Sequence, residues 1–203
     1  MKIKICGLKS YEDVDIINVC KPDYAGFVFA KGRHLLTKDE ARELVSRLDP
    51  RITPVGVFVN EDLESLAEIV RYCGLHAVQL HGDEDDLYIK KAGNVRVIKC
   101  VRTRDTGSVQ KGLATSADYV LFDTFDTKER GGTGRLADAS LIPKDLSKPY
   151  FLAGGINPEN IEQVLRDNPN AYAVDISSGA EDESGKSFEK VSKLVQTVRE
   201  FEV

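Results

Sequence analysis

The sequence predicts an α/β fold, namely a single-domain (β/α)8 barrel in which eight parallel strands alternate with helices. Short apolar runs with strand character alternate along the chain with segments whose apolar residues recur at helical spacing. Two late strand ends, within 150–160 and 171–179, carry turns that suit an anion, and such barrels usually bind phosphate after strands seven and eight. An open doubly wound sheet is the alternative, and these two turns argue against it.

The predicted elements alternate in strict order. Residues 2–7 form a strand, and residues 10–19 form a helix whose S-Y-E-D start is like a capping box. The helix at 37–48 has Thr37 as N-cap with Glu40 three residues later, and it ends before Pro50. The other strands are expected at 24–30, 52–59, 77–80, 95–101, 119–123, 150–152 and 171–175, and the other helices at 61–72, 84–91, 158–166 and 187–201.

The helices after strands five and six are expected to be trimmed. Residues 109–116 make a weak fifth helix, because Gly107 and Gly112 dilute its helical propensity, and residues 137–142 make a poor sixth one. A long glycine-rich loop at 124–134 precedes the latter, and we expect it to be mobile and to close over a ligand. An ordinary flexible surface loop is the alternative.

Length and composition indicate one cytoplasmic domain over residues 1–203. The 28 basic and 33 acidic side chains give a net charge of −5, so no overall positive field recruits nucleic acid or an anionic membrane. No apolar run approaches the roughly eighteen residues of a membrane span, and the first residues lack the apolar core of a signal peptide. The four cysteines have neither C-x-x-C nor zinc-site spacing, so we expect thiols without disulfides and no metal.

The two late turns point to one phosphate. Gly154 and Gly155 end a strand, after which Asn157 is a good N-cap and Pro158 a good first helical residue. Backbone N–H groups and a helix dipole would therefore face an anion there. Residues 177–179, S-S-G, repeat this plan after the next strand. Either turn alone is more simply an ordinary tight connection, and together they favour phosphate.

Strand parity selects the residues that face the barrel lumen at its catalytic end. In the first strand Ile3 and Ile5 belong to the helix side, which leaves Lys4 and Cys6 toward the lumen. The same parity places three further side chains at strand ends around this cavity, namely His81, Asp123 and Asp175.

Cys6 and Asp123 are the candidates for acid–base chemistry. A lone cysteine is often a small core residue, but a lumen-facing Lys4 would stabilise the thiolate and make the sulfur a usable base. Lys4 itself has two other interpretations, a solvated strand end or a buried ion pair. Asp123, in F-D-T-F-D, suits a general acid if the phenylalanines partly bury it. A turn-forming aspartate is the alternative, and Asp126 is the reserve candidate.

Arg33 and His81 are the candidates for binding. Arg33 follows the second strand, where a guanidinium can take a ligand carboxylate bidentately, and a solvated loop charge is the alternative. His81, in Q-L-H-G, has no second histidine or cysteine at metal-ligand spacing, since His34 and His76 lie on other elements. A hydrogen-bonding role is therefore favoured over metal binding.

Eight short motifs follow one another in a specific order: K-I-C-G at 4–7, G-F-V-F at 26–29, V-G-V-F-V-N at 55–60, V-Q-L-H-G at 78–82, D-T at 123–124, G-G-T-G at 131–134, L-A-G-G-I-N-P-E-N at 152–160 and V-D-I-S-S-G at 174–179. With these motifs the sequence resembles the phosphoribosylanthranilate isomerase family nearly from end to end. Two segments depart from the family pattern. R-L-A-D at 135–138 stands where a Phe with an Asp or Asn is usual, and K-G-R-H-L at 31–35 replaces S-x-R-Y-I.

This resemblance implies an Amadori rearrangement of N-(5-phosphoribosyl)anthranilate to 1-(2-carboxyphenylamino)-1-deoxyribulose 5-phosphate in tryptophan biosynthesis, without cofactor or metal. It implies that Asp123 protonates the furanose oxygen and that Cys6 removes the C2 proton. The implied binding residues are Arg33 for the anthranilate carboxylate, Asp175 for the sugar hydroxyls and, for the phosphate, the backbone around Gly154, Gly155, Ser177 and Ser178. His81 stays a binding candidate from its position in the sequence. The implied partner is a small phosphosugar, bound by a monomer or homodimer.

Two other functions stay open. The histidine-pathway isomerase family runs the same chemistry on a larger substrate with two phosphates, and it uses paired aspartates. Here the first strand ends in Cys6, and no second glycine-rich turn follows strands three and four. A phosphosugar-binding protein without catalysis is the other alternative, against which Cys6, Asp123 and Arg33 argue.

Overall fold

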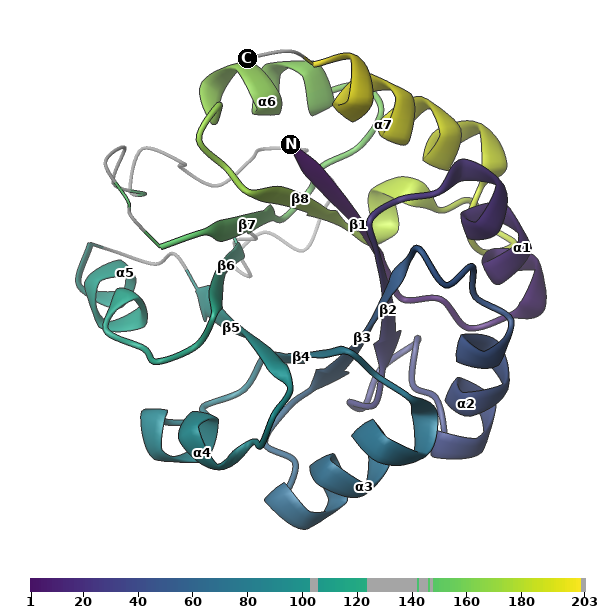
Figure 1. The fold of residues 1–203 in the computed structure, drawn as a ribbon. Helices are drawn as coiled ribbons and strands as arrows, with labels where there is room; N and C mark the ends of the chain where they lie inside the picture. The colour runs from purple at the N-terminus through teal and green to yellow at the C-terminus, as the bar shows by residue number, and fades with distance from the viewer. Residues whose placement is uncertain (103–105, 124–141, 143–145, 147, 202–203) are drawn as a thin grey trace.

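The chain folds into a closed barrel of eight parallel strands, each hydrogen-bonded to the next and the last to the first (Figure 1). This computed structural model describes residues 1–102, 106–123, 142, 146 and 148–201. The strands are β1 (Lys2–Cys6), β2 (Tyr24–Val28), β3 (Thr53–Phe58), β4 (Ala77–Leu80), β5 (Arg96–Arg102), β6 (Tyr119–Asp123), β7 (Tyr150–Ala153) and β8 (Ala173–Ile176). The predicted (β/α)8 barrel is therefore confirmed.

Helices form an outer ring around the strands (Figure 1). They are α1 (Tyr11–Cys20), α2 (Lys38–Ser46), α3 (Leu63–Cys73), α4 (Asp86–Lys91), α5 (Thr106–Leu113), α6 (Ile161–Asp167) and α7 (Phe188–Glu200), with a short 3-10 helix, η2 (Ser178–Ala180), after β8. Helix α5 has eight residues and starts at Thr106 rather than at residue 109, and α4 and α6 are shorter still, with six and seven. The loop expected at 124–134 lies outside the described residues, as does the helix expected at 137–142 apart from residue 142.

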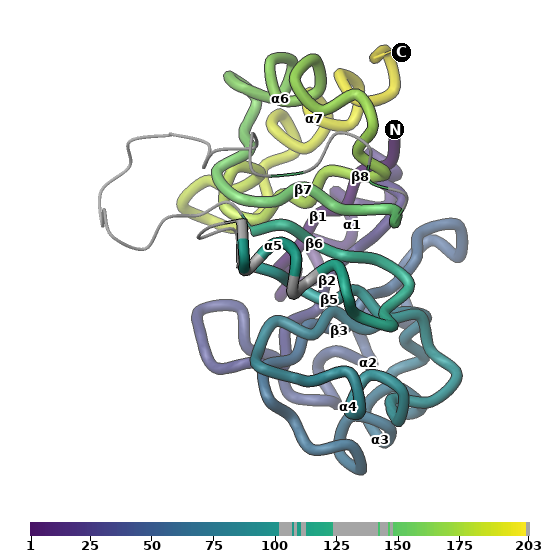
Figure 2. The backbone as a smooth tube through the Cα atoms, turned by 90° about the vertical axis from the view of Figure 1, so that its left-hand side faces the viewer, coloured from purple at the N-terminus to yellow at the C-terminus, as the bar shows by residue number. Residues whose placement is uncertain are grey.

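The ends of the described chain lie together. Helix α7 packs against α1 and α6, and a view from the side shows the start of β1 and the end of α7 on the same side of the barrel (Figure 2). None of the helices in the described part of the chain is long and apolar enough to cross a membrane.

Local capping explains where the first two helices begin. The Ser10 hydroxyl accepts a hydrogen bond from the backbone N–H of Asp13 at 3.1 Å, and the Asp13 carboxylate accepts one from the N–H of Ser10 at 3.2 Å. Thr37 and Glu40 form the same reciprocal pair at the start of α2. Both predicted capping boxes are confirmed, because each depends only on residues three positions apart.

The start of α6 differs from the prediction. The sequence predicts a helix over 158–166 with Asn157 as its N-cap, whereas α6 begins at Ile161 with Asn160 in the capping position. The Asn157 side chain accepts from the N–H groups of Glu159 and Asn160 at 2.9 and 3.1 Å, and the Asn160 side chain accepts from the N–H of Asn157 at 2.9 Å. These reciprocal bonds hold the first residues in a separate turn, so the regular helix begins after them.

Side chains along each strand alternate between two hydrophobic clusters, as the predicted parity requires. Ile3 and Ile5 pack in the larger cluster, which fills the space between strands and helices. The smaller cluster fills the lumen and consists of Val55, Ala77, Ile98, Cys100, Leu121, Phe151, Ala153 and Ala173.

Three tyrosines close the lumen at the N-terminal ends of the strands. The rings of Tyr24, Tyr119 and Tyr172 surround Phe151, with centroid distances to its ring of 5.4, 5.5 and 5.6 Å. The hydroxyls of Tyr24 and Tyr172 are 2.7 Å apart. A ligand therefore has to approach the lumen from the opposite end, where the strands have their C-termini.

Gly179 allows the turns after β7 and β8 to approach each other. A Cβ atom at residue 179 would overlap the carbonyl oxygen of Ile156 and lie 3.0 Å from the Cα of Asn157. The chain after β8 can therefore pack against the turn after β7 only because residue 179 has no side chain.

We predict that Gly179→Ala lowers the free energy of unfolding by about 1–3 kcal/mol, the usual cost of overpacking. The backbone of Ile156 has to shift, because a carbonyl oxygen cannot rotate away as the end of a side chain can. Gly32→Ala is the control, since no described atom lies within 4 Å of its added Cβ. Chemical denaturation measures both variants, and equal stability of the two would contradict this close approach.

Candidate active site

A buried ion pair lies in the lumen where β8 meets β1. Lys4 and Asp175 occupy paired positions of the two strands, and Lys4 Nζ donates a hydrogen bond of 2.8 Å to Asp175 Oδ1. The side chains are 0% and 8% exposed. Burial opposes the charge on Lys4, but the carboxylate of Asp175 outweighs it, so the pKa of Lys4 is raised. Of the interpretations of Lys4, the buried ion pair is the one that the structure shows.

Cys6 ends β1 and is buried. A Cβ atom on Gly26 would lie 2.7 Å from Cys6 Sγ, so the sulfur occupies space that a glycine in β2 leaves open. Burial raises the pKa of the Cys6 thiol, and the negative charge of Asp175 adds to this effect. Lys4 and Lys186 lower the pKa of the thiol, but the net shift remains upward. Lys4 therefore favours the thiolate, as expected from the sequence, but burial has the larger effect and the pKa of the thiol stays above its usual value.

Asp123, His81 and Gln79 form a hydrogen-bonded row across the ends of β6 and β4. His81 Nε2 lies 3.3 Å from Asp123 Oδ2, and His81 Nδ1 lies 3.1 Å from the amide nitrogen of Gln79. The side chains of His81 and Asp123 are 27% and 25% exposed, so a ligand can reach both. His81 takes part in hydrogen bonds, as predicted. The reserve candidate, Asp126, lies outside the described residues.

Cys100 is a further lumen group near this row and is not among the site residues predicted from the sequence. It is buried on β5, the strand between those that end at His81 and Asp123. An imidazole nitrogen of His81, Sγ of Cys100 and a carboxylate oxygen of Asp123 lie within 4.8 Å of one another. Spacing along the sequence could not reveal this group, because its members come from three neighbouring strands.

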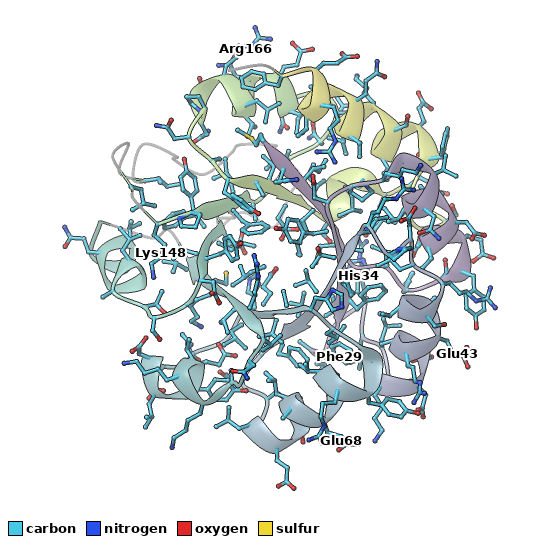
Figure 3. All side chains as sticks on the ribbon, in the orientation of Figure 1. Phe29, His34, Glu43, Glu68, Lys148 and Arg166 are labelled. Carbon is cyan, nitrogen blue, oxygen red and sulfur yellow. The ribbon has the colours of Figure 1, made fainter. Side chains whose placement is uncertain are left out.

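Arg33 lies on the loop between β2 and α2, where it pairs with Glu181 just beyond η2. The other carboxylate oxygen of Glu181 accepts a hydrogen bond from Lys186 Nζ at 2.5 Å and lies 2.9 Å from His34 Nε2. Figure 3 shows His34 closer to the barrel axis than Glu43, which points outward from α2. The Arg33 side chain is 62% exposed, yet it is not a merely solvated loop charge.

Lys186 connects the cluster of Arg33, His34 and Glu181 to the ends of β1 and β8. Its side chain is buried, and Nζ donates hydrogen bonds to the carbonyl oxygens of Cys6 at 2.6 Å and Ser177 at 3.2 Å. Burial lowers the pKa of Lys186 to about 8. Neither Lys186 nor Glu181 is among the sequence-predicted site residues, and their only sequence signal is that they closely follow the S-S-G turn.

The two turns predicted to bind phosphate are neighbours. Strands β7 and β8 pair with Ala153 opposite Asp175, so the chain after each strand leaves the barrel beside the other. Gly154 and Gly155 have φ values of 102° and 65°, which glycine adopts far more readily than other residues. The predicted phosphate-binding residues at 154–155 and 177–178 therefore lie at one part of the rim.

The closed barrel, with titratable groups gathered at the C-terminal ends of its strands, defines a (β/α)8-barrel protein with a candidate site at the usual end of the barrel. The family model for N-(5'-phosphoribosyl)anthranilate (PRA) isomerase matches residues 3–197. The chain is 40% identical over 200 residues to the N-(5'-phosphoribosyl)anthranilate isomerase of Thermoanaerobacter sp. (strain X514), with 98% of each chain covered.

Solved structures agree. A phosphoribosyl anthranilate isomerase in complex with reduced 1-(o-carboxyphenylamino)-1-deoxyribulose 5-phosphate matches with a TM-score of 0.84 at 30% identity, covering 99% of this chain and 100% of the other. Monomers generated from the dimeric enzyme of Thermotoga maritima match with a TM-score of 0.84 at 29% identity and the same coverage. The chain therefore belongs to the N-(5'-phosphoribosyl)anthranilate isomerase family and is an isomerase of tryptophan biosynthesis.

We predict that replacing Lys4 and replacing Asp175 shift the pKa of Cys6 in opposite directions. Lys4→Met removes a cation that favours the thiolate and should raise this pKa further, whereas Asp175→Asn removes an anion and should lower it. The pH dependence of Cys6 alkylation, followed by mass spectrometry of its peptide, measures both shifts.

Circular dichroism is the control for folding, since breaking a buried ion pair costs about 3–5 kcal/mol. Two folded variants whose Cys6 pKa values move in the same direction would contradict the electrostatic account.

Proposed function

We propose that the chain carries out the Amadori rearrangement of N-(5-phosphoribosyl)anthranilate to 1-(2-carboxyphenylamino)-1-deoxyribulose 5-phosphate with Asp123 as general acid and Cys6 as general base. The observation that supports these roles is that both side chains end strands of one closed barrel, whose lumen is shut at the other end. Family membership supplies the reaction, and the geometry supplies candidates for its two proton transfers.

Asp123 is proposed to start the reaction. In its protonated form it would donate a proton to the furanose ring oxygen, so that the C1–O bond breaks and the anthranilate nitrogen forms a protonated Schiff base with C1. The contact of 3.3 Å with His81 Nε2 orients the carboxyl group from the side of β4.

Cys6 is proposed to take the proton from C2 of this Schiff base, which gives an enolamine that tautomerises to the ketone. A neutral thiol is a poor base, so the thiol must first release its proton to solvent at the open end of the barrel. Lys4 and Lys186 already favour the thiolate, and the positive charge of the Schiff base adds a third cation beside the sulfur. The thiolate therefore forms mainly once ring-opened substrate is bound. Both steps are proton transfers, and the proposal includes no cofactor and no catalytic metal.

The charged groups of the substrate are proposed to bind around the rim. Arg33 takes the anthranilate carboxylate while Glu181 holds its guanidinium in place, because five N–H donors can serve two carboxylates. Asp175 and His81 take hydroxyl groups of the sugar. The phosphate binds at the adjacent turns, which contain Gly154, Gly155, Ser177 and Ser178.

The proposed partner is a small phosphosugar, and we propose no nucleic-acid or membrane partner. A similar structure holds a reduced carboxyphenylamino-deoxyribulose phosphate, which supports this substrate class.

We propose that the protein works as a monomer or a homodimer, because one chain carries all the proposed residues and the Thermotoga relative is named in both states. We also propose a cytoplasmic location, supported by four cysteines that form no disulfide, all of them in the described residues.

We predict that Cys6→Ala and Asp123→Asn each lower kcat by at least about 10²-fold with little change in KM, because each removes a proton transfer and leaves binding contacts in place. Steady-state kinetics followed by anthranilate fluorescence measure the loss. Cys73→Ala is the matched control, since Cys73 is also buried but ends α3 in the outer ring. Near-native kcat in folded Cys6→Ala would reject the base assignment and make His81 the candidate.

We predict that Arg33→Met raises KM by about 10- to 100-fold with a smaller change in kcat, as expected for a charge-assisted contact worth about 1.5–3 kcal/mol. The anthranilate carboxylate keeps its charge during the reaction, so the contact stabilises substrate and transition state alike. Arg33→Lys should recover only part of the loss, because one ammonium cannot bind bidentately. Lys31→Met, at an exposed cation of the same loop, is the control. An unchanged KM in Arg33→Met would remove Arg33 from the binding site.

A further inference from the structure

Three potential metal ligands of different chemistry meet at the open end of the lumen. His81, Cys100 and Asp123 come from β4, β5 and β6, and their ligand atoms lie within 4.8 Å of one another. Cys100 is buried, while His81 and Asp123 are partly exposed, so a cation can enter from solvent and reach the sulfur behind them. We propose that this cluster binds a thiophilic divalent cation such as Zn²⁺ and that binding inhibits the enzyme.

The donor set suits Zn²⁺. Zinc takes thiolate, imidazole and carboxylate ligands, and with bonds of about 2.0–2.3 Å its tetrahedral ligand atoms lie about 3.4–3.6 Å apart. The 3.3 Å between His81 Nε2 and Asp123 Oδ2 already matches this spacing. Because the ligand atoms lie within 4.8 Å of one another, the sulfur of Cys100 needs to move by about 1.2–1.4 Å at most to reach this spacing. Water would complete the coordination at the exposed side, and Cys100 would release its thiol proton to solvent on binding.

Gln79 provides the support that a metal-binding histidine needs. Coordination through His81 Nε2 requires the proton on Nδ1, and this proton requires an acceptor. The Gln79 amide lies 3.1 Å from Nδ1, and Gln79 Oε1 is buried and makes no hydrogen bond within the described residues. A half-turn of the amide would bring Oε1 onto Nδ1–H, and this oxygen has no bond among those residues to give up.

The inhibitory effect rests on the proposed function, whereas the binding does not. Asp123 has to carry a proton to the furanose oxygen, and a carboxylate that coordinates Zn²⁺ can no longer hold that proton. The metal would also occupy the place that the substrate takes beside His81. This site is therefore inhibitory and separate from any requirement for a metal in the reaction.

Cobalt binding tests the site itself. Co²⁺ bound to a thiolate gives a charge-transfer absorption band, which Zn²⁺ should abolish by displacement. We expect this band in the wild-type enzyme and in Cys73→Ala, and we expect Cys100→Ala to weaken binding by at least about 10²-fold, since the loss of even a supporting group costs about 10- to 100-fold. Cys100→Ser keeps the size of the side chain and serves if the alanine variant does not fold. Absence of the band from the wild type, or an unchanged band in folded Cys100 variants, would overturn the site; the latter would place the metal at Cys6.

Inhibition is measured separately. Zn²⁺ should inhibit the wild type and Cys73→Ala, and a chelator should restore activity. Cys100→Ala should keep its basal activity and need at least about 10²-fold more Zn²⁺ for the same inhibition. Cobalt binding that depends on Cys100, without inhibition by Zn²⁺, would keep the metal site but overturn the inhibition and count against Asp123 as the acid. The two proposals therefore fail in distinguishable ways.

Discussion

The buried ion pair between Lys4 and Asp175 is the interaction on which the barrel and its chemistry both depend. It lies where the last strand meets the first, at positions that face each other across the closing seam. Removing an ion from water costs several kcal/mol in a protein, so neither charge is tolerable there without the other. A slip of one residue in the register of β8 would turn Asp175 out of the lumen and leave Lys4 unpaired. The pair therefore favours one register between β8 and β1 where the barrel closes. It also places one cation and one anion beside the sulfur of Cys6.

Lys186 is a second buried lysine, and it connects strand ends at the rim of the barrel. It holds the backbone at Cys6 and Ser177, so the segments at the ends of β1 and β8 meet on one buried ammonium. The loop after β2 joins them indirectly, because Arg33 shares Glu181 with Lys186. The low pKa of this ammonium, about 8, reflects the cost of burying it, which the nearby negative charges of Asp13 and Asp175 only partly offset. Cys6, the turn at Ser177 and Arg33 are thereby fixed relative to one another by Lys186, which none of the sequence motifs contains.

The features that were predicted correctly from the sequence depend on residues close together in the chain. Parity placed Cys6 and Asp123 at the catalytic end because side chains alternate along a strand, and the capping boxes worked because their partners are three residues apart. The prediction for α6 failed at Asn157, because Asn157 and Asn160 each accept a hydrogen bond from the other's backbone N–H and form a separate turn before the helix. Lys186 bonds to a carbonyl 180 residues away, so no spacing rule could have found it. Parity applied to the fifth strand would have found Cys100, which packs in the lumen cluster beside Ile98.

The charged groups proposed for the substrate already have protein partners. The pairs are Asp175 with Lys4, Asp123 with His81, and Arg33 with Glu181. Each group is held in a fixed orientation before the ligand arrives, so the site does not have to order it during the reaction. A substrate that binds here extends existing hydrogen-bond networks instead of meeting bare charges, which lowers the cost of removing water from the rim. The same networks surround Cys6. Burial raises the pKa of its thiol, while Lys4 and Lys186 favour the thiolate even though they also bind other partners. In the proposed mechanism the positive charge of the ring-opened substrate adds to these two cations.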